Sequence, residues 1–193
     1  MEILLASASP RRAELMKLAG IPFTAVPTGA DETLPEGILP AAAVETLALR
    51  KAQAAAQRHP QALVVGADTV VSAEGRILGK PEGRADAARM LRLLSGRTHQ
   101  VYTGVALLSP AGQEVFHQRT DVAFYPLEEE TIAWYLDTGE PFDKAGAYGI
   151  QQRGALLVER ISGDYFNVVG FPIALVARKL RALEGKSAFF ERK

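Results

Sequence analysis

The 193-residue chain has no cysteine, which excludes disulfides, zinc–thiolate centres and cysteine nucleophiles. Histidine is also scarce, because only His59, His99 and His117 are present and their scattered positions form no ligand motif. Any metal would therefore be bound by oxygen atoms, which favours a hard cation such as magnesium over zinc. We expect the three histidines to lie at the surface and the single tryptophan, Trp134, to pack in the core.

Neither an excess charge nor a long apolar run is present. The 22 Lys and Arg residues balance the 22 Asp and Glu residues, so the formal net charge is zero. Proteins that bind long nucleic acids usually carry a basic surplus, so we expect no nucleic-acid polymer as a partner. No apolar stretch approaches the roughly 18 residues of a membrane span, and the first residues lack the features of a secretory signal. We expect a cytoplasmic protein that has no membrane partner.

Apolar runs and turn signals alternate in an order that predicts an α/β domain with a mixed sheet. Strands are expected at residues 2–6, 21–26, 62–71, 76–78, 98–109, 113–125 and 155–161, and the two longest should form a hairpin. Helices are expected at 10–19, 40–58, 84–95, 127–137 and 172–184, and loops at 27–39 and 138–153. A single domain covering 1–193 is predicted, with about the last seven residues as a frayed tail.

The segment Ser7-Ala-Ser-Pro-Arg-Arg12 lies where the first predicted strand meets the first helix. The backbone N–H groups and the dipole of a helix N-terminus attract anions, whereas cations in the first turn are usually unfavourable. The adjacent Arg11 and Arg12 therefore indicate a phosphate site. The alternative, which this segment alone leaves open, is a solvated helix start with two surface arginines.

Lys51 interrupts the apolar stripe of the second helix. It follows Val44, Leu47 and Ala48 at spacings of seven, four and three, where the helical period calls for an apolar side chain. Snorkelling, in which the stem covers apolar surface while the ammonium reaches water, is a common explanation and is favoured by periodicity alone. A functional lysine facing a cleft is the alternative.

Asp68 interrupts the apolar run from Ala62 to Val71. A carboxylate in an apolar strand costs several kcal/mol unless a cation, a metal or hydrogen-bond donors compensate. At a strand end that faces a cleft, Asp68 could hold a metal or act as a general base. The alternative is a carboxylate that accepts hydrogen bonds from nearby backbone amides.

These charges together suit a metal-bound triphosphate. Cations would neutralise the phosphate oxygens and carboxylates would hold the metal, so positioning and charge carry the chemistry. The chain contains neither a Walker A pattern nor G-x-G-x-x-G, and it has no G-x-S-x-G nucleophile elbow. The residues in question are Arg11, Arg12, Lys51 and Lys80, with Glu32 and Asp68. Glu32, in an acidic loop, and Lys80 are weaker signals by themselves, and an ordinary turn lysine is the alternative for Lys80.

Over nearly its whole length the sequence resembles the Maf proteins, also called septum-formation inhibitor-like proteins. The motifs that carry the resemblance are 5–12 (LASASPRR), 48–52 (ALRKA), 65–71 (VGADTVV), 78–81 (LGKP), 94–101 (LSGRTHQV), 143–151 (DKAGAYGIQ) and 163–170 (GDYFNVVG). The resemblance implies a nucleoside-triphosphate pyrophosphatase with an elongated, inosine-triphosphatase-like fold, in which two lobes flank a nucleotide cleft. It also implies a homodimer and a divalent metal cofactor, Mg²⁺ or Mn²⁺.

The resemblance further implies roles for single residues. Ser7, Arg12, Lys51 and Lys80 would contact the triphosphate. Glu32 would assist with the metal, and Asp68 would be the proton acceptor or metal ligand that activates water. Asp143 and Lys144 lie in a matching loop without a firm role.

Three further residues resemble the pyrimidine branch of the family, which acts on dTTP and UTP. These are Arg11, Thr69 and Gln151, and the amide of Gln151 could both donate to and accept from the edge of uracil or thymine. Two alternatives stay open: a pyrophosphatase acting on 7-methyl-GTP or a damaged purine, and a catalytically silent nucleotide-binding regulator of cell division.

Overall fold

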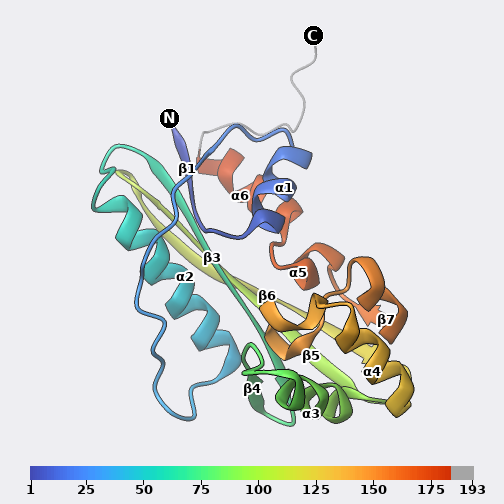
Figure 1. The fold of residues 1–193 in the computed structure, drawn as a ribbon. Coiled ribbons are helices and arrows are strands. Elements are labelled where there is room, and N and C mark those ends of the chain that lie inside the picture. Colours follow the sequence, from blue (N-terminus) through green and yellow to red (C-terminus); the bar gives the residue numbers. More distant parts are fainter. Residues whose placement is uncertain (184–193) are drawn as a thin grey trace.

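The computed structural model describes residues 1–183 and has an α/β fold built on a seven-stranded mixed sheet (Figure 1). The strands are β1 (Ile3–Ala6), β2 (Thr24–Ala25), β3 (Leu63–Ala73), β4 (Arg76–Leu78), β5 (Thr98–Ser109), β6 (Gly112–Phe124) and β7 (Val158–Ser162). The α-helices are α1 (Pro10–Leu18), α2 (Pro40–Ala56), α3 (Arg84–Leu94), α4 (Glu129–Asp137), α5 (Tyr165–Val169) and α6 (Ile173–Leu183). The expected α/β class with a mixed sheet is confirmed. The predicted frayed tail lies outside the described residues.

The strand order leaves part of one strand with a single neighbour. The order is β2-β1-β3-β5-β6-β7, and β4 also pairs with β3. The parallel pairing of β1 with β3 ends at Ala6 opposite Gly66, and the antiparallel pairing of β4 begins at Val71. Between these points, residues 67–70 of β3 pair with β5 alone. This open edge lies in the middle of β3 and contains Asp68, which is therefore not at a strand end as the sequence suggested.

The two faces of the sheet are covered differently. Helix α2 packs along one face of the long strands, whereas α1 with α6 and α3 with α4 cover opposite ends of the other face (Figure 1). Each end has its own apolar core. One contains Leu5, Val65 and Phe171, and the other contains Val71, Leu91 and Phe124. The chain thus forms two lobes that share one sheet.

Two glycines bring α2 close to the sheet. A Cβ on Gly66 would lie 2.2 Å from the carbonyl oxygen of Ala48, and one on Gly104 would lie 2.3 Å from that of Val44. Neither position can carry a side chain without displacing the helix, because real Cβ contacts are essentially never this short. The close approach places residues of α2 directly over the middle of β3 and β5.

Several predicted elements differ in extent. The strand expected at 21–26 is reduced to Thr24–Ala25, since Pro22 has no N–H for a ladder. The 3-10 helices η1 (Glu140–Asp143), η2 (Ala145–Ala147) and η3 (Gln152–Leu157) occupy the loop expected at 138–153 and delay β7 to residue 158. Helix α5 was not predicted, because five residues are too few to show a helical period. No helix within residues 1–183 is long and apolar enough to cross a membrane.

Two expected placements were wrong. His99 is only 1% exposed, and its Nε2 lies 2.7 Å from the Tyr148 hydroxyl in the core of one lobe. Burial lowers the pKa of His99 to about 4, so the ring is neutral near pH 7. Trp134 is 42% exposed, because its neighbours Tyr135 and Leu136 occupy the inward face of α4.

Candidate active site

Glu32, Lys51 and Asp68 form a group of ionised side chains, termed here the ion triad. The Lys51 Nζ lies 2.5 Å from Asp68 Oδ1 and 2.7 Å from Glu32 Oε1. The side chains of Lys51 and Asp68 are each only 14% exposed, whereas that of Glu32 is 64% exposed. The lysine therefore does not reach open water, and the snorkelling alternative is replaced by an ion pair at the open edge of β3.

The sequence segments that build the ion triad are held by local contacts. Asp68 points from β3 toward α2, which the glycines of the sheet bring close enough for Lys51 to reach it. Glu32 comes from the loop before α2. The Arg50 guanidinium fixes that loop by donating to the carbonyl oxygens of Asp31, at 3.2 Å, and Thr33, at 2.6 Å. Sequence reasoning missed Arg50, since nothing in the helical pattern distinguishes it from a surface arginine.

The surrounding charges favour the ionised form of Glu32. The hydrogen bond from Lys51 lowers the pKa of Glu32, against the opposite effect of burial. The positive charges of Lys51, Lys80 and Arg12 act in the same direction as the hydrogen bond. Lys80, in the segment after β4, thus acts electrostatically on Glu32 of the ion triad.

Arg12 donates most of its guanidinium N–H groups to protein acceptors around the open edge of β3. Its Nε donates to the carbonyl oxygen of Gly170 at 2.9 Å, and one terminal nitrogen donates to Ser7 Oγ at 3.1 Å and to the Ala67 carbonyl at 2.8 Å. The other terminal nitrogen donates to Thr69 Oγ1 at 3.1 Å. These contacts use four of the five guanidinium N–H groups, which leaves one for a ligand.

Burial affects the pKa of Arg12, and hydrogen bonds hold its neighbour Ser7. Burial lowers the pKa of the Arg12 guanidinium, and the nearby Asp68 carboxylate opposes that shift. Ser7 is 8% exposed, and its hydroxyl also accepts from the backbone N–H of Ser9 at 3.2 Å. The loop that leads into α1 is thus fixed against β3 by side chains, and no acidic residue lies in the first turn of α1.

Arg11 points toward the other lobe. It lies 3.7 Å from Asp143, whose carboxylate also contacts Lys144 Nζ at 2.6 Å. Although burial acts in the opposite direction, Lys144 and Arg11 lower the pKa of Asp143. The two residues of the matching loop without an assigned role, Asp143 and Lys144, therefore connect the arginine-bearing helix to the opposite lobe.

Four buried or half-buried polar residues, termed here the polar seam, cross the sheet face between the two apolar cores. They are Thr69 on β3, Thr103 on β5, Thr120 on β6 and Asn167 on α5. The hydroxyls of Thr69 and Thr103 lie 2.9 Å apart, and the Asn167 amide donates to Thr120 Oγ1 at 3.0 Å. Thr69 therefore joins Arg12 to a network that spans three strands and α5.

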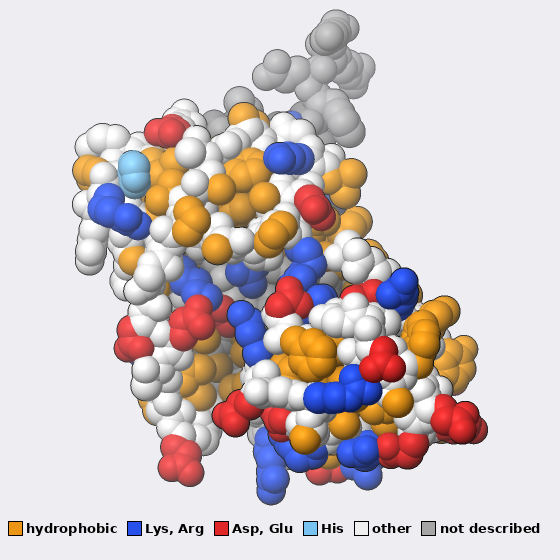
Figure 2. Space-filling view, viewed as in Figure 1, with side chains coloured by type: hydrophobic (Ala, Val, Ile, Leu, Met, Phe, Trp, Pro, Cys, Tyr) orange, Lys and Arg blue, Asp and Glu red, His pale blue; other side chains and the backbone are white. Residues whose placement is uncertain are grey.

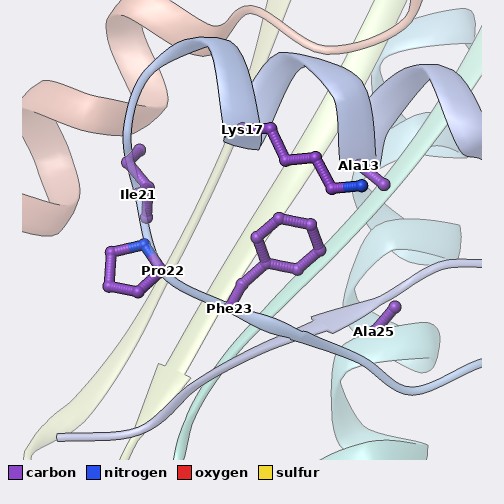
Figure 3. A pocket seen from close by; sticks show the side chains of 6 residues that line it. All are labelled: Ala13, Lys17, Ile21, Pro22, Phe23 and Ala25. Atoms are coloured by element: carbon purple, nitrogen blue, oxygen red, sulfur yellow. The ribbon is translucent and has the colours of Figure 1, made fainter.

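A charged furrow crosses the surface of the molecule. Figure 2 shows Lys, Arg, Asp and Glu side chains gathered in a hollow between the upper part of the molecule, which contains α1, and the lower right part, which contains α3 and α4. A separate hollow of about 410 Å³ lies on the other side of α1, with Lys17 beside the Phe23 ring (Figure 3). None of its lining residues belongs to the candidate site.

A comparison with family models matches residues 2–183 to the family described as Maf-like protein. The chain belongs to this family. It is similar to a protein of Moorella thermoacetica named dTTP/UTP pyrophosphatase, with 58% identity over 181 residues that cover 93% of each chain. A protein of the same name from Bacillus cytotoxicus is 51% identical over 183 residues, covering 95% of this chain and 96% of its own. The solved structure of the Staphylococcus aureus Ham1 protein is similar with a TM-score of 0.47 and 18% identity, covering 64% of this chain and 72% of that one.

The carboxylates of this Maf-like chain do not by themselves form a complete binding site for a hard divalent cation. No group of three or more His, Cys, Asp or Glu side chains that could hold a metal occurs within residues 1–183. Asp68 and Glu32 each use one oxygen for Lys51, and the second oxygen of each accepts no hydrogen bond from the described residues. Magnesium is commonly bound by one or two carboxylates together with substrate phosphates, so these residues fit such an ion when a triphosphate is present.

Gln151 leads into a segment that is held by a residue that sequence reasoning missed. It immediately precedes η3, and the Glu140 carboxylate accepts from the backbone N–H groups of Arg153 and Gly154, both at 3.3 Å. The Glu140 carbonyl also accepts from Lys144 Nζ at 2.7 Å. Glu140 thus fixes the start of η3. The signal that could have found it is a carboxylate in the turn just before the motif of residues 143–151.

Proposed function

We propose that this chain hydrolyses dTTP and UTP, and modified pyrimidine analogues, to the nucleoside monophosphate and pyrophosphate. The observation that carries the proposal is the ion triad at the open edge of β3, beside the arginines of α1. Relatives that are 51% and 58% identical and are named dTTP/UTP pyrophosphatase support it.

The proposed chemistry needs a water molecule activated next to the α-phosphorus. Asp68 accepts a proton from this water as the new oxygen–phosphorus bond forms, and the bond from the α-phosphorus to the bridging oxygen breaks. Pyrophosphate leaves with that oxygen, and the proton on Asp68 passes to solvent. Lys51 orients the carboxylate, since its Nζ lies 2.5 Å from Oδ1.

The remaining cations bind the triphosphate in this proposal. Lys80, the free N–H of Arg12 and the N-terminus of α1 face a polyanion, which helix N-termini and guanidinium groups both favour. Asp68 and Glu32 would hold Mg²⁺ or Mn²⁺ together with phosphate oxygens. When bound, such an ion supplies positive charge that neutralises the phosphate oxygens as the phosphorus–oxygen bond breaks.

Base selection is assigned to Arg11, Thr69 and Gln151. The N–H groups of the Gln151 amide suit the C=O groups of uracil and thymine, which leaves the ring N–H of the base for a second acceptor. The ion pair between Arg11 and Asp143 connects α1 to the segment that leads to Gln151, so Arg11 and Gln151 can contact one nucleotide from different elements.

We also propose a homodimer, for which light scattering after size exclusion would give twice the monomer mass.

The decisive experiment is pyrophosphate release from a panel of canonical and methylated nucleoside triphosphates, with magnesium and then with manganese. Release from dTTP and UTP, lost on chelation and restored by the metal, is the expected result. Release chiefly from 7-methyl-GTP would keep the chemistry and overturn the base assignment. Tight nucleotide binding without release under either metal would overturn the enzyme assignment in favour of a regulatory role.

A further inference from the structure

The Thr69 hydroxyl is surrounded by groups that leave little freedom for its proton. Arg12 can only donate, so Thr69 Oγ1 accepts that hydrogen bond at 3.1 Å. The Gly170 carbonyl, 3.3 Å away, can only accept. The third neighbour is the Thr103 hydroxyl at 2.9 Å, where either oxygen could be the donor.

The direction of this third bond follows from the next link. Thr103 Oγ1 lies 3.0 Å from the carbonyl oxygen of Asn167, which carries no hydrogen and must accept. A hydroxyl has a single proton, so Thr103 donates it to Asn167 and has only lone pairs to offer Thr69. The proton of Thr69 therefore points toward Thr103, with the Gly170 carbonyl as a longer alternative acceptor.

This direction determines what Thr69 can offer a ligand. A hydroxyl has one proton and two lone pairs, and the proton and one lone pair of Thr69 are already used inside the protein. Toward a ligand, the half-buried hydroxyl can then act only as a hydrogen-bond acceptor. A side chain that usually both donates and accepts has become selective for ligand N–H groups.

We infer that Thr103 is a specificity-determining positioning residue, which holds Thr69 as an acceptor for the ring N3–H of uracil or thymine. The inference rests on the proposed function, in which Thr69 faces the base. Cytosine carries an unprotonated N3 at the same ring position and would meet a second lone pair. A site built to bond an N–H discriminates against a base that lacks it, because the partner is left unpaired. The pair Thr103–Thr69 thus separates uracil and thymine from cytosine, which they otherwise match in size.

The test compares kcat/KM for UTP and CTP in the wild type, Thr103→Val, Thr103→Ser and Thr120→Val. Valine replaces the hydroxyl of Thr103 with a methyl group of similar shape and removes the nearer acceptor for the Thr69 proton. Serine retains the hydroxyl and should restore it. Thr120 is a matched control, since it is also 0% exposed and also bonds to α5, through Asn167 Nδ2 and the Asp164 carbonyl, but it does not touch Thr69.

The wild type should prefer UTP over CTP, and Thr103→Val should reduce that ratio about tenfold, the effect of one hydrogen bond. Thr103→Ser should keep the wild-type ratio, and Thr120→Val should lower the Tm without changing the ratio. A wild type that releases pyrophosphate equally from UTP and CTP overturns the inference even if no variant folds. So does a Thr103→Val protein with an unchanged ratio. A wild type inactive on both UTP and dTTP would instead refute the proposed function.

Discussion

Asp68 and Thr69 are adjacent in the sequence but lie on opposite faces of β3, in two different kinds of environment. Toward α2, the ion triad joins three ionised side chains, one of which is 64% exposed. Toward the two lobes, the polar seam joins neutral hydroxyls and an amide to a single guanidinium. Alternation along one strand places a charged group and a neutral group at the same open edge.

The difference between the two faces matches the proposed division of work. Ionised groups act strongly on phosphate and on an attacking water, and they need partners such as Lys51 because an unpaired buried charge is expensive. Neutral hydroxyls contribute little charge but have a definite donor and acceptor direction, as Thr69 does. In the proposed function, chemistry therefore belongs to the α2 face, and base recognition belongs to Thr69 on the lobed face. Substitutions on the two faces should have separable effects.

The largest expected effect is the loss of turnover in Asp68→Asn. The amide cannot accept the proton of the attacking water, so kcat should fall on the order of 10²- to 10⁴-fold. The ion pair of Lys51 with Glu32, at 2.7 Å, remains, and the fold should stay intact. Pyrophosphate release and far-UV circular dichroism measure the two properties.

A change on the opposite face provides the contrast to Asp68→Asn. Thr69→Val should lose most of its discrimination between UTP and CTP, with a much smaller loss of kcat on UTP. If Asp68→Asn kept a kcat within tenfold of the wild type, or if both variants lost turnover equally, the division between the two faces would be wrong.

A second expected effect concerns the close approach of α2, on which the ion triad depends. In Gly66→Ala the new Cβ would lie 2.2 Å from the Ala48 carbonyl oxygen and 2.8 Å from the Ala52 nitrogen. The helix must move away, which separates Lys51 from Asp68. Overpacking of this kind should lower the free energy of unfolding by about 3 kcal/mol and also reduce turnover.

The matched control for this steric effect is Gly29→Ala. A Cβ at Gly29 would have no neighbour within 4 Å, and its φ is not positive. Its free energy of unfolding, measured by urea denaturation, should stay within about 0.5 kcal/mol of the wild type. A Gly66→Ala protein as stable and as active as Gly29→Ala would show that the helix does not need this approach.

Two of the three residues of the ion triad could be identified from the sequence because each breaks a local pattern, whereas the role of Glu32 was implied only by the family resemblance. Lys51 interrupts an apolar helical stripe, and Asp68 interrupts an apolar strand. Their common position was not predictable in the same way. It depends on where the pairing of β1 ends and that of β4 begins, and strand pairing is a long-range property.

Several residues that sequence reasoning missed or misplaced have distant partners. Arg50 holds backbone oxygens 17 and 19 positions away, and His99 is buried because Tyr148 lies 49 positions along the chain. In the sequence, Thr103 cannot be distinguished from any other β-branched residue of a strand. Its proposed function depends on contacts with Thr69 and Asn167, which belong to other elements. Residues that break local sequence patterns indicated the charged face, whereas the contacts of the neutral face were found only from the structure.

The smallest expected effect is a pH dependence that distinguishes the two faces, tested by Lys51→Met with Thr120→Val as the control. In the wild type the hydrogen bond from Lys51 lowers the pKa of Glu32 in the folded state. A lowered carboxyl pKa stabilises the fold above the unfolded value of about 4.3, and this stabilisation is lost as the pH falls through the folded pKa. Methionine cannot lower the pKa of Glu32, so the Tm difference from the wild type should shift against the variant between pH 3 and pH 7. The shift should be small, because the Glu32 side chain is 64% exposed and solvent screens the pair.

The Tm deficit of Thr120→Val should be the same at both pH values, since no hydroxyl of the polar seam titrates in that range. Equal pH dependence in the two variants would remove the electrostatic distinction between the faces of β3.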